Sequence, residues 1–150
     1  MPTQLETIQY HQAKKALAEA EAAKEKLRAE TAILDEKKTN LQTQYNQTVK
    51  KVQEIESSLP VIASRIEQAW SATVPEMISL LQQRDAMQAI KKACLTHLEL
   101  LNGEIQVCIR QANDLMQKIH NIGFYVIPPL RKEIAEHQRL AAADEFNAPM

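Results

Sequence analysis

The chain has 150 residues and a formal net charge of -1, with 18 basic and 19 acidic side chains. The two signs are interspersed, which argues against the one-sided positive field that nucleic-acid binding requires. Only 2 glycines and 4% aromatic residues accompany abundant Ala, Glu, Lys, Gln and Leu, and this composition is typical of long helices. The N-terminus lacks an apolar signal segment, and no run approaches the roughly 18 apolar residues of a membrane span. We therefore expect a cytoplasmic protein, with non-classical export left open.

A first long helix is expected over residues 3–58, because no glycine or proline interrupts this stretch. Thr3 and Glu6 have the spacing of a capping box at its start. The apolar stripe is thin, and it recurs at intervals of seven in two series: Ala20, Leu27, Leu34 and Leu41, then Tyr45, Val52 and Leu59. The two series are four residues out of step, which predicts a stutter that locally unwinds a supercoil.

A tight turn is expected at residues 58–60, where Ser58 can cap and Pro60 fits the first turn of a following helix. A continuous helix kinked at Pro60 is the alternative. A short helix should then cover residues 61–73, before a second break or kink around Pro75. Trp70 is the only tryptophan. We expect it to anchor a core or an interface, and a ligand-stacking role is the alternative.

The next helix, over residues 76–122, carries the strongest pattern in the chain. Its apolar residues step by alternating gaps of three and four, as in a helix that buries one face against another helix. This central seam comprises Leu98, Leu101, Ile105, Cys108, Ala112, Leu115, Ile119 and Ile122. Val107, Ile109 and Met116 lie beside the seam, so the apolar surface is wider than one partner helix needs. Gly103 suggests close approach by a neighbouring helix.

Gly123 is expected to end this helix in a left-handed conformation. Pro128 and Pro129 should then hold residues 123–129 as an extended link. The aromatic and aliphatic residues Phe124, Tyr125, Val126 and Ile127 are expected either to tuck against the bundle end or to form an exposed docking or membrane-touching tip. A last helix is expected over residues 130–143.

These elements predict a single all-α domain: an elongated antiparallel helical hairpin or coiled coil, with a short C-terminal helix packing back on it. A turn near Pro60 would place Leu98 and Leu101 opposite the alanines between Ala16 and Ala23, a large-against-small pairing that allows close approach. The C-terminal helix would then cover a second flank of the central helix, while the rest of the hairpin would need a partner.

No residue pattern points to an enzyme. The chain has no glycine-rich phosphate loop and no supported nucleophile–histidine arrangement, so we expect no catalytic, cofactor or metal site. Glu133 and His137 share a helix face, where a surface pair is the expected role and metal binding the alternative. Cys94 and Cys108 are too far apart on one helix to bridge; buried thiols are expected, with an interchain bridge in a parallel dimer as the alternative.

The function expected from these features is a non-enzymatic coiled-coil interaction protein, acting as a scaffold, adaptor or chaperone-like component. Its partners should be proteins, in a homo-oligomer or a helical hetero-complex, because the second long helix carries more apolar surface than the first can cover. Nucleic acid is not expected as a partner. A membrane-acting, toxin- or effector-like protein that uses Phe124 to Ile127 is the less favoured alternative.

Overall fold

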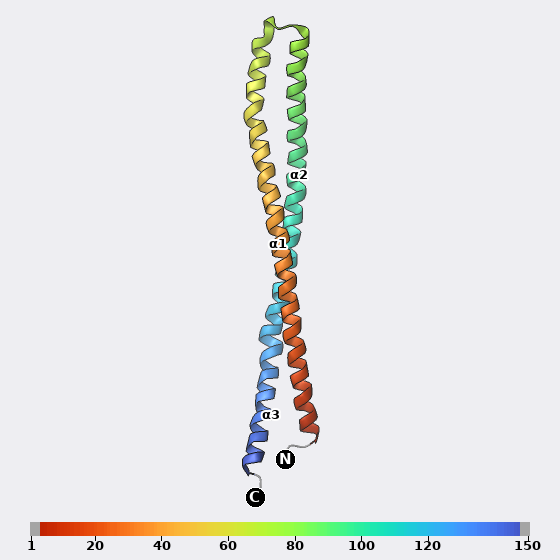
Figure 1. Ribbon diagram of the computed structural model, residues 1–150, viewed down its shortest axis with the longest axis vertical. Coiled ribbons are helices and arrows are strands. Elements are labelled where there is room, and N and C mark those ends of the chain that lie inside the picture. The colour runs from red at the N-terminus through yellow and green to blue at the C-terminus, as the bar shows by residue number, and fades with distance from the viewer. Residues whose placement is uncertain (1–3, 148–150) are drawn as a thin grey trace. The chain divides into compact units, whose positions relative to one another are not determined.

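The computed structural model describes the backbone of residues 4–147 and the side chains of residues 7–143. Its elements in chain order are helix α1 (Gln4–Gln68), the 3₁₀-helix η1 (Ala69–Ser71), helix α2 (Val74–Asn121), the π-helix η2 (Ile122–Val126) and helix α3 (Ile127–Asn147) (Figure 1). No strand occurs in the part of the chain described. The long helices α1 and α2 pack against each other in opposite directions, so the predicted all-α antiparallel hairpin is confirmed. The predicted Thr3 cap lies outside the described residues.

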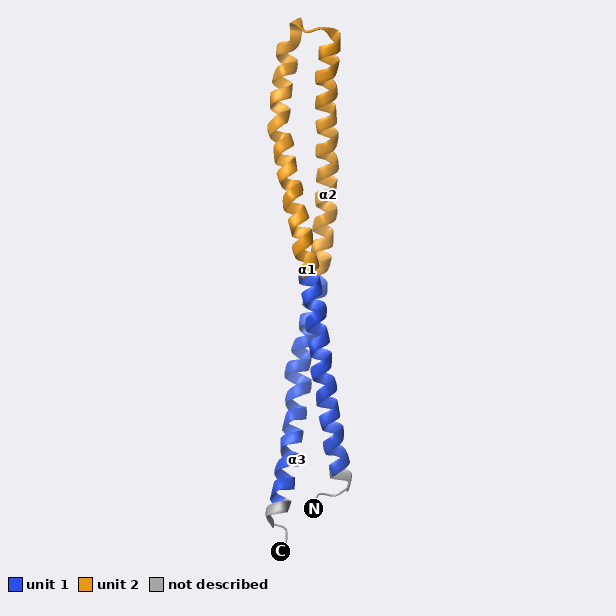
Figure 2. Ribbon diagram, in the orientation of Figure 1, with its two compact units in different colours: residues 1–35, 110–150 blue, residues 36–109 orange. Residues whose placement is uncertain are grey.

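The chain divides into two compact units (Figure 2). The turn unit, residues 36–109, contains the second part of α1, η1 and most of α2. The terminal unit, residues 1–35 and 110–150, contains the first part of α1, the end of α2, η2 and α3. Each unit therefore consists mainly of two packed helical segments, and its stability depends chiefly on the contacts between them.

The predicted turn at residues 58–60 and the separate helix at 61–73 are wrong, because α1 continues through Pro60 to Gln68. Proline in a helix interior removes one backbone hydrogen bond and crowds the carbonyl four residues earlier. The apolar spacing nevertheless runs through it unbroken: Leu59 and Ile62, on either side of Pro60, both face inward, and Ile62 is only 4% exposed. Packing on both sides therefore holds the helix together across the proline.

The chain reverses instead at Ala72 and Thr73, between η1 and α2. The Thr73 hydroxyl accepts a hydrogen bond from the Glu76 backbone N–H (3.4 Å), and the Glu76 carboxylate accepts one from the Thr73 N–H (3.3 Å). This reciprocal pair is a capping box, with the cap residue and the third helical residue in their usual roles. Pro75 lies in the first turn of α2, where its missing N–H costs no hydrogen bond. The second predicted break is thus the turn of the hairpin.

Replacing Thr73 by Ala should lower the free energy of unfolding by about 0.5–2 kcal/mol, since one cap hydrogen bond is lost at the start of α2. Thr73→Ser, which keeps the hydroxyl, is the matched control and should lie close to the parent chain. Urea unfolding followed by circular dichroism measures both variants. Equal losses for Ala and Ser would show that the hydroxyl is not what holds this turn.

The predicted stutter in α1 is also wrong. Along α1 the buried and half-buried positions continue to alternate by three and four residues, with one exposed position, Lys38, between Leu34 and Leu41. The two series of sevens read from the sequence are the two edges of one inward stripe, and four is the ordinary step from one edge to the other. In the terminal unit the stripe includes Lys24 and Thr31, so it is polar as well as narrow there.

The core of the turn unit is a cluster in which Leu41 of α1 meets Leu101, Ile105 and Cys108 of α2, all at most 7% exposed. Further from the cluster, the Lys91 ammonium lies 3.4 Å from the Glu56 carboxylate. Later residues of α1 therefore meet earlier residues of α2, as an antiparallel pair requires. Since Leu101 packs with Leu41, its predicted pairing with the alanines of residues 16–23 is wrong, and the displaced turn is the reason.

No left-handed cap or extended link follows α2. Gly123 does not have a positive φ, and residues 122–126 form one turn of π-helix that leads directly into α3 at Ile127. The inward positions explain this turn. They end on Ile119 in α2 and Ile122, the first residue of η2, and resume on Ile127 and Leu130. The step from Ile122 to Ile127 is therefore five residues, where a regular helix allows three or four. A π turn adds one residue and brings both sides into phase.

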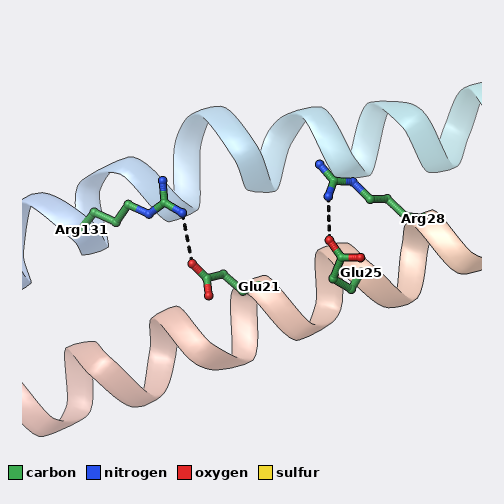
Figure 3. Close-up of polar contacts among 4 residues, drawn as sticks. All are labelled: Glu21, Glu25, Arg28 and Arg131. Atoms are coloured by element: carbon green, nitrogen blue, oxygen red, sulfur yellow. Dashed lines mark hydrogen bonds and ion pairs between the residues drawn. The ribbon is translucent and has the colours of Figure 1, made fainter.

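In the terminal unit α3 packs against the first part of α1, continuing the direction of α2 without a reversal at Pro128 and Pro129. The Arg131 guanidinium donates a hydrogen bond across the helix pair to the Glu21 carboxylate (3.2 Å), whereas Arg28 bonds Glu25 within α1 (2.6 Å) (Figure 3). Tyr10 meets the His137 ring edge-on at 5.9 Å. The predicted C-terminal helix thus packs on α1, but it starts at Ile127 rather than residue 130 and forms no third layer.

Candidate interaction surfaces

The central seam faces inward along α2. Leu101, Ile105 and Cys108 are buried in the turn-unit core, at 3%, 6% and 1% exposure. The other five members, Leu98, Ala112, Leu115, Ile119 and Ile122, are half-buried. The seam therefore serves contacts within the chain in the first place. Surface for a partner must be sought on the sides of α2 that α1 does not reach.

A second group of apolar side chains lies on the exposed side of α2 in the turn unit. Ile90, Leu100 and Val107 are 46%, 64% and 44% exposed. Gly103 lies among them, and a Cβ atom built on it would meet nothing within 4 Å. The close helix approach expected at Gly103 is therefore not made within the chain. Ile109 lies on the other flank, where it packs against the core cluster.

The segment expected as a docking tip is divided by the π turn. Phe124, Tyr125 and Val126 are 67%, 72% and 42% exposed, whereas Ile127 is 5% exposed and belongs to the inward stripe. The Phe124 ring stacks on His120, one turn earlier, with centroids 4.3 Å apart. This contact orients the Phe124 ring while most of its surface stays in water. The exposed part of the predicted tip is a helical ridge of three residues.

Trp70 is 88% exposed in η1, so the prediction that it anchors the core of the chain is wrong. Its exposed position is compatible with the other predicted role, that of an interface anchor. Val74, the first residue of α2 after the turn at Ala72 and Thr73, is 71% exposed. A tryptophan indole buries a large apolar area when it is covered, and its N–H then needs a partner. An indole left in water at a tight turn is therefore available to a second molecule.

The hollows of the surface are shallow grooves between paired helices. One in the terminal unit has an apolar base of Leu34 and Leu115, with Glu30, Asp114 and Lys118 at its rim. One in the turn unit is lined by residues of both helices, including Ile90, Ala93, Cys94 and His97. Such open grooves suit the side chains of a packed helix, whereas a small molecule is normally enclosed on most of its surface.

The titratable side chains of the described residues are dispersed over these surfaces. The His137 ring lies 3.8 Å from the Glu133 carboxylate, and within the described residues no group of three or more His, Cys, Asp or Glu is placed to hold a metal. The Arg139 guanidinium, which hydrogen-bonds the Glu136 carboxylate, lowers the pKa of that carboxyl. Glu136 is exposed, and an exposed ion pair one turn apart on a helix contributes little beyond local helix stability.

Comparison of the chain with protein-family models, curated proteins and solved structures found no match. Within the described residues, none of the helices combines the length and the apolar character needed to cross a membrane.

Proposed function

We propose that this chain is a non-enzymatic helical interaction protein of the cytoplasm, a coiled-coil scaffold, adaptor or chaperone-like component that acts through contacts with other proteins. The observation that carries the proposal is the exposure of large apolar side chains on helical elements. Trp70, Phe124 and Tyr125 are each at least 67% exposed. Aromatic residues dominate the energetics of protein interfaces, and stable folds rarely leave them in water without a use.

The total accessible surface supports the same proposal. The chain exposes 11215 Å² for a mass of 17.0 kDa. A compact monomer of this mass would expose roughly 7,700 Å². The difference, about 3,500 Å² by the same relation, is larger than the area that a standard protein–protein complex buries. A chain with this much uncovered surface gains stability from any partner that covers its apolar part.

Photo-crosslinking in the cells that make the protein tests the proposal. A photoreactive amino acid at Tyr125 or at Trp70 should give discrete adducts with other protein chains, because both side chains point into solvent on ordered elements. The same amino acid at Gln53, an exposed polar position of α1, is the matched control and should give none. Adducts at Gln53 equal to those at Tyr125 and Trp70, or no adducts at any position, would contradict the proposal.

A membrane-acting protein is the second candidate, favoured by the exposed ridge of Phe124, Tyr125 and Val126. An apolar ridge of this kind binds a bilayer interface when its buried area outweighs the cost of dehydrating nearby polar groups. Co-sedimentation with vesicles, neutral or anionic, tests this role. Binding that Phe124→Ser and Val126→Ser abolish would support it, whereas no binding by the parent chain would end it.

A further inference from the structure

The exposed side of α2 in the turn unit carries a second regular pattern, independent of the central seam. Its residues alternate by three and four along the helix, with alanines in the first half and the larger Leu100 and Val107 in the second half, on either side of Gly103. This outer face comprises Ala86, Ala89, Ala93, Thr96, Leu100, Gly103 and Val107, with Ile90 at its edge. All eight residues are exposed. A helix with two apolar faces is normally packed on both sides.

Contacts within the chain do not explain why residue 103 of the outer face is a glycine. Glycine inside a helix is less stable than alanine, because it loses more conformational freedom on folding. The space around Gly103 is open, since a Cβ atom there would meet nothing within 4 Å. Nothing in the chain therefore requires glycine at this position. A helix from a second molecule that approaches this point closely would require it.

We propose that the outer face binds the same face of a second copy of the chain, with the two α2 helices antiparallel around a two-fold axis near Thr96 and His97. In this register the Ile90 side chain lies over Gly103 of the second copy. Val107 lies opposite Ala86, and Leu100 lies opposite Ala93, each contact occurring twice by symmetry. Every large side chain then meets a small one, which allows two helices to approach closely.

The charges beside the outer face favour this occupant. Lys92 and Glu99 lie one heptad apart on the same edge, and both are exposed. In the antiparallel register Lys92 of each copy comes within about one helical turn of Glu99 in the other, so two opposite-charge pairs flank the contact. In a parallel, in-register pairing this edge of the two copies would lie on opposite sides of the contact, so Lys92 and Glu99 would form no pair between copies.

The dimer deepens the proposed function, because it names a second copy as one protein partner and α2 as the surface. It leaves Trp70 and the ridge at Phe124 and Tyr125 free for other partners.

The first test is the mass of the full-length chain by light scattering, over a range of concentrations. The parent chain should be a dimer, and Leu100→Asp should weaken its dissociation constant by at least 100-fold while leaving the helical circular dichroism unchanged. Lys92→Glu and Glu99→Lys should each weaken the dimer about tenfold or more. The double variant, Lys92→Glu with Glu99→Lys, should recover most of the loss, because the swapped charges meet only between copies.

The register is tested by disulfide formation in a Cys94→Ser background. Mixing Ala93→Cys chains with Leu100→Cys chains should give a cross-linked dimer on oxidation, while Ala93→Cys chains alone should give little, since these two positions meet only in the antiparallel pairing. A monomer at every concentration, a dimer that Leu100→Asp leaves intact, or stronger cross-linking of Ala93→Cys to itself would overturn the proposal. A monomer that still forms adducts at Tyr125 would overturn the dimer and leave the proposed function standing.

Discussion

Leu101→Asp is expected to unfold the turn unit at room temperature or to leave it marginally stable. Leu101 is 3% exposed and packs with Leu41, Ile105 and Cys108 in the core cluster. Removing a buried leucine costs about 2–5 kcal/mol, and burying an unpaired carboxylate in its place adds a further penalty. A two-helix pair with few fully buried residues has little stability in reserve, so we expect a loss of at least about 3 kcal/mol.

Leu95→Asp is the matched control, because Leu95 lies on the same helix at 44% exposure. It should lower the free energy of unfolding by less than about 1 kcal/mol. Guanidinium unfolding followed by circular dichroism at 222 nm compares the two variants with the parent chain. Similar losses for Leu95→Asp and Leu101→Asp would mean that the cluster around Leu101 is not the centre of the fold.

Deleting Tyr125 is expected to leave the terminal unit folded, although the deletion falls within continuous helix. The π turn at residues 122–126 holds one residue more than a regular helix would. Without Tyr125 the step from Ile122 to Ile127 would be four residues, so an α-helix would keep both side chains on the inward face. We expect the free energy of unfolding to change by less than about 1 kcal/mol, and the local turn to become α-helical.

Deleting Gln117 is the control for this experiment. It also removes one exposed residue, but from regular α-helix, so every later inward residue rotates by about 100°. Ile119 and Ile122 would leave the contact with α1, and each loss of a half-buried isoleucine costs about 1 kcal/mol or more. Hydrogen exchange of residues 110–143 and thermal unfolding distinguish the variants. Equal destabilisation by the two deletions would show that the π turn does not adjust the register.

The apolar spacing predicted the helical class and the antiparallel hairpin, because a face repeated at three and four residues can be buried only against another helix. The strongest spacing, that of the central seam, predicted a buried face, and the eight seam residues do face inward. The predicted turn at residues 58–60 is wrong because one proline does not end a helix whose apolar stripe continues beyond it. The stripe through Val52, Ile55, Leu59, Ile62 and Ile66 crosses Pro60 without a change of phase, and that longer pattern outweighs one proline.

The π turn at residues 122–126 has a signal in the apolar spacing. A regular α-helix cannot place both Ile122 and Ile127, five residues apart, on its inward face. Gly123 favours a helix end in the sequence, but in the structure a π turn at this point connects α2 directly to α3. The exposure of Trp70 could not be predicted, because it depends on where the chain reverses. The close approach of a neighbouring helix expected at Gly103 is not made within the chain, and spacing within one chain does not distinguish contacts inside it from contacts with a second molecule.

The free thiols of the turn unit differ in their access to solvent. Cys94 is half-buried beside a groove, whereas Cys108 is 1% exposed within the core cluster. A soluble thiol reagent can therefore reach Cys94 in the folded chain, but it reaches Cys108 only while α1 and α2 are separated around Leu101. Cys108 modification then proceeds at a rate set by the opening equilibrium of this helix pair. The rate of Cys94 modification therefore reports the reactivity of the reagent, and the rate of Cys108 modification relative to it reports how often the core opens.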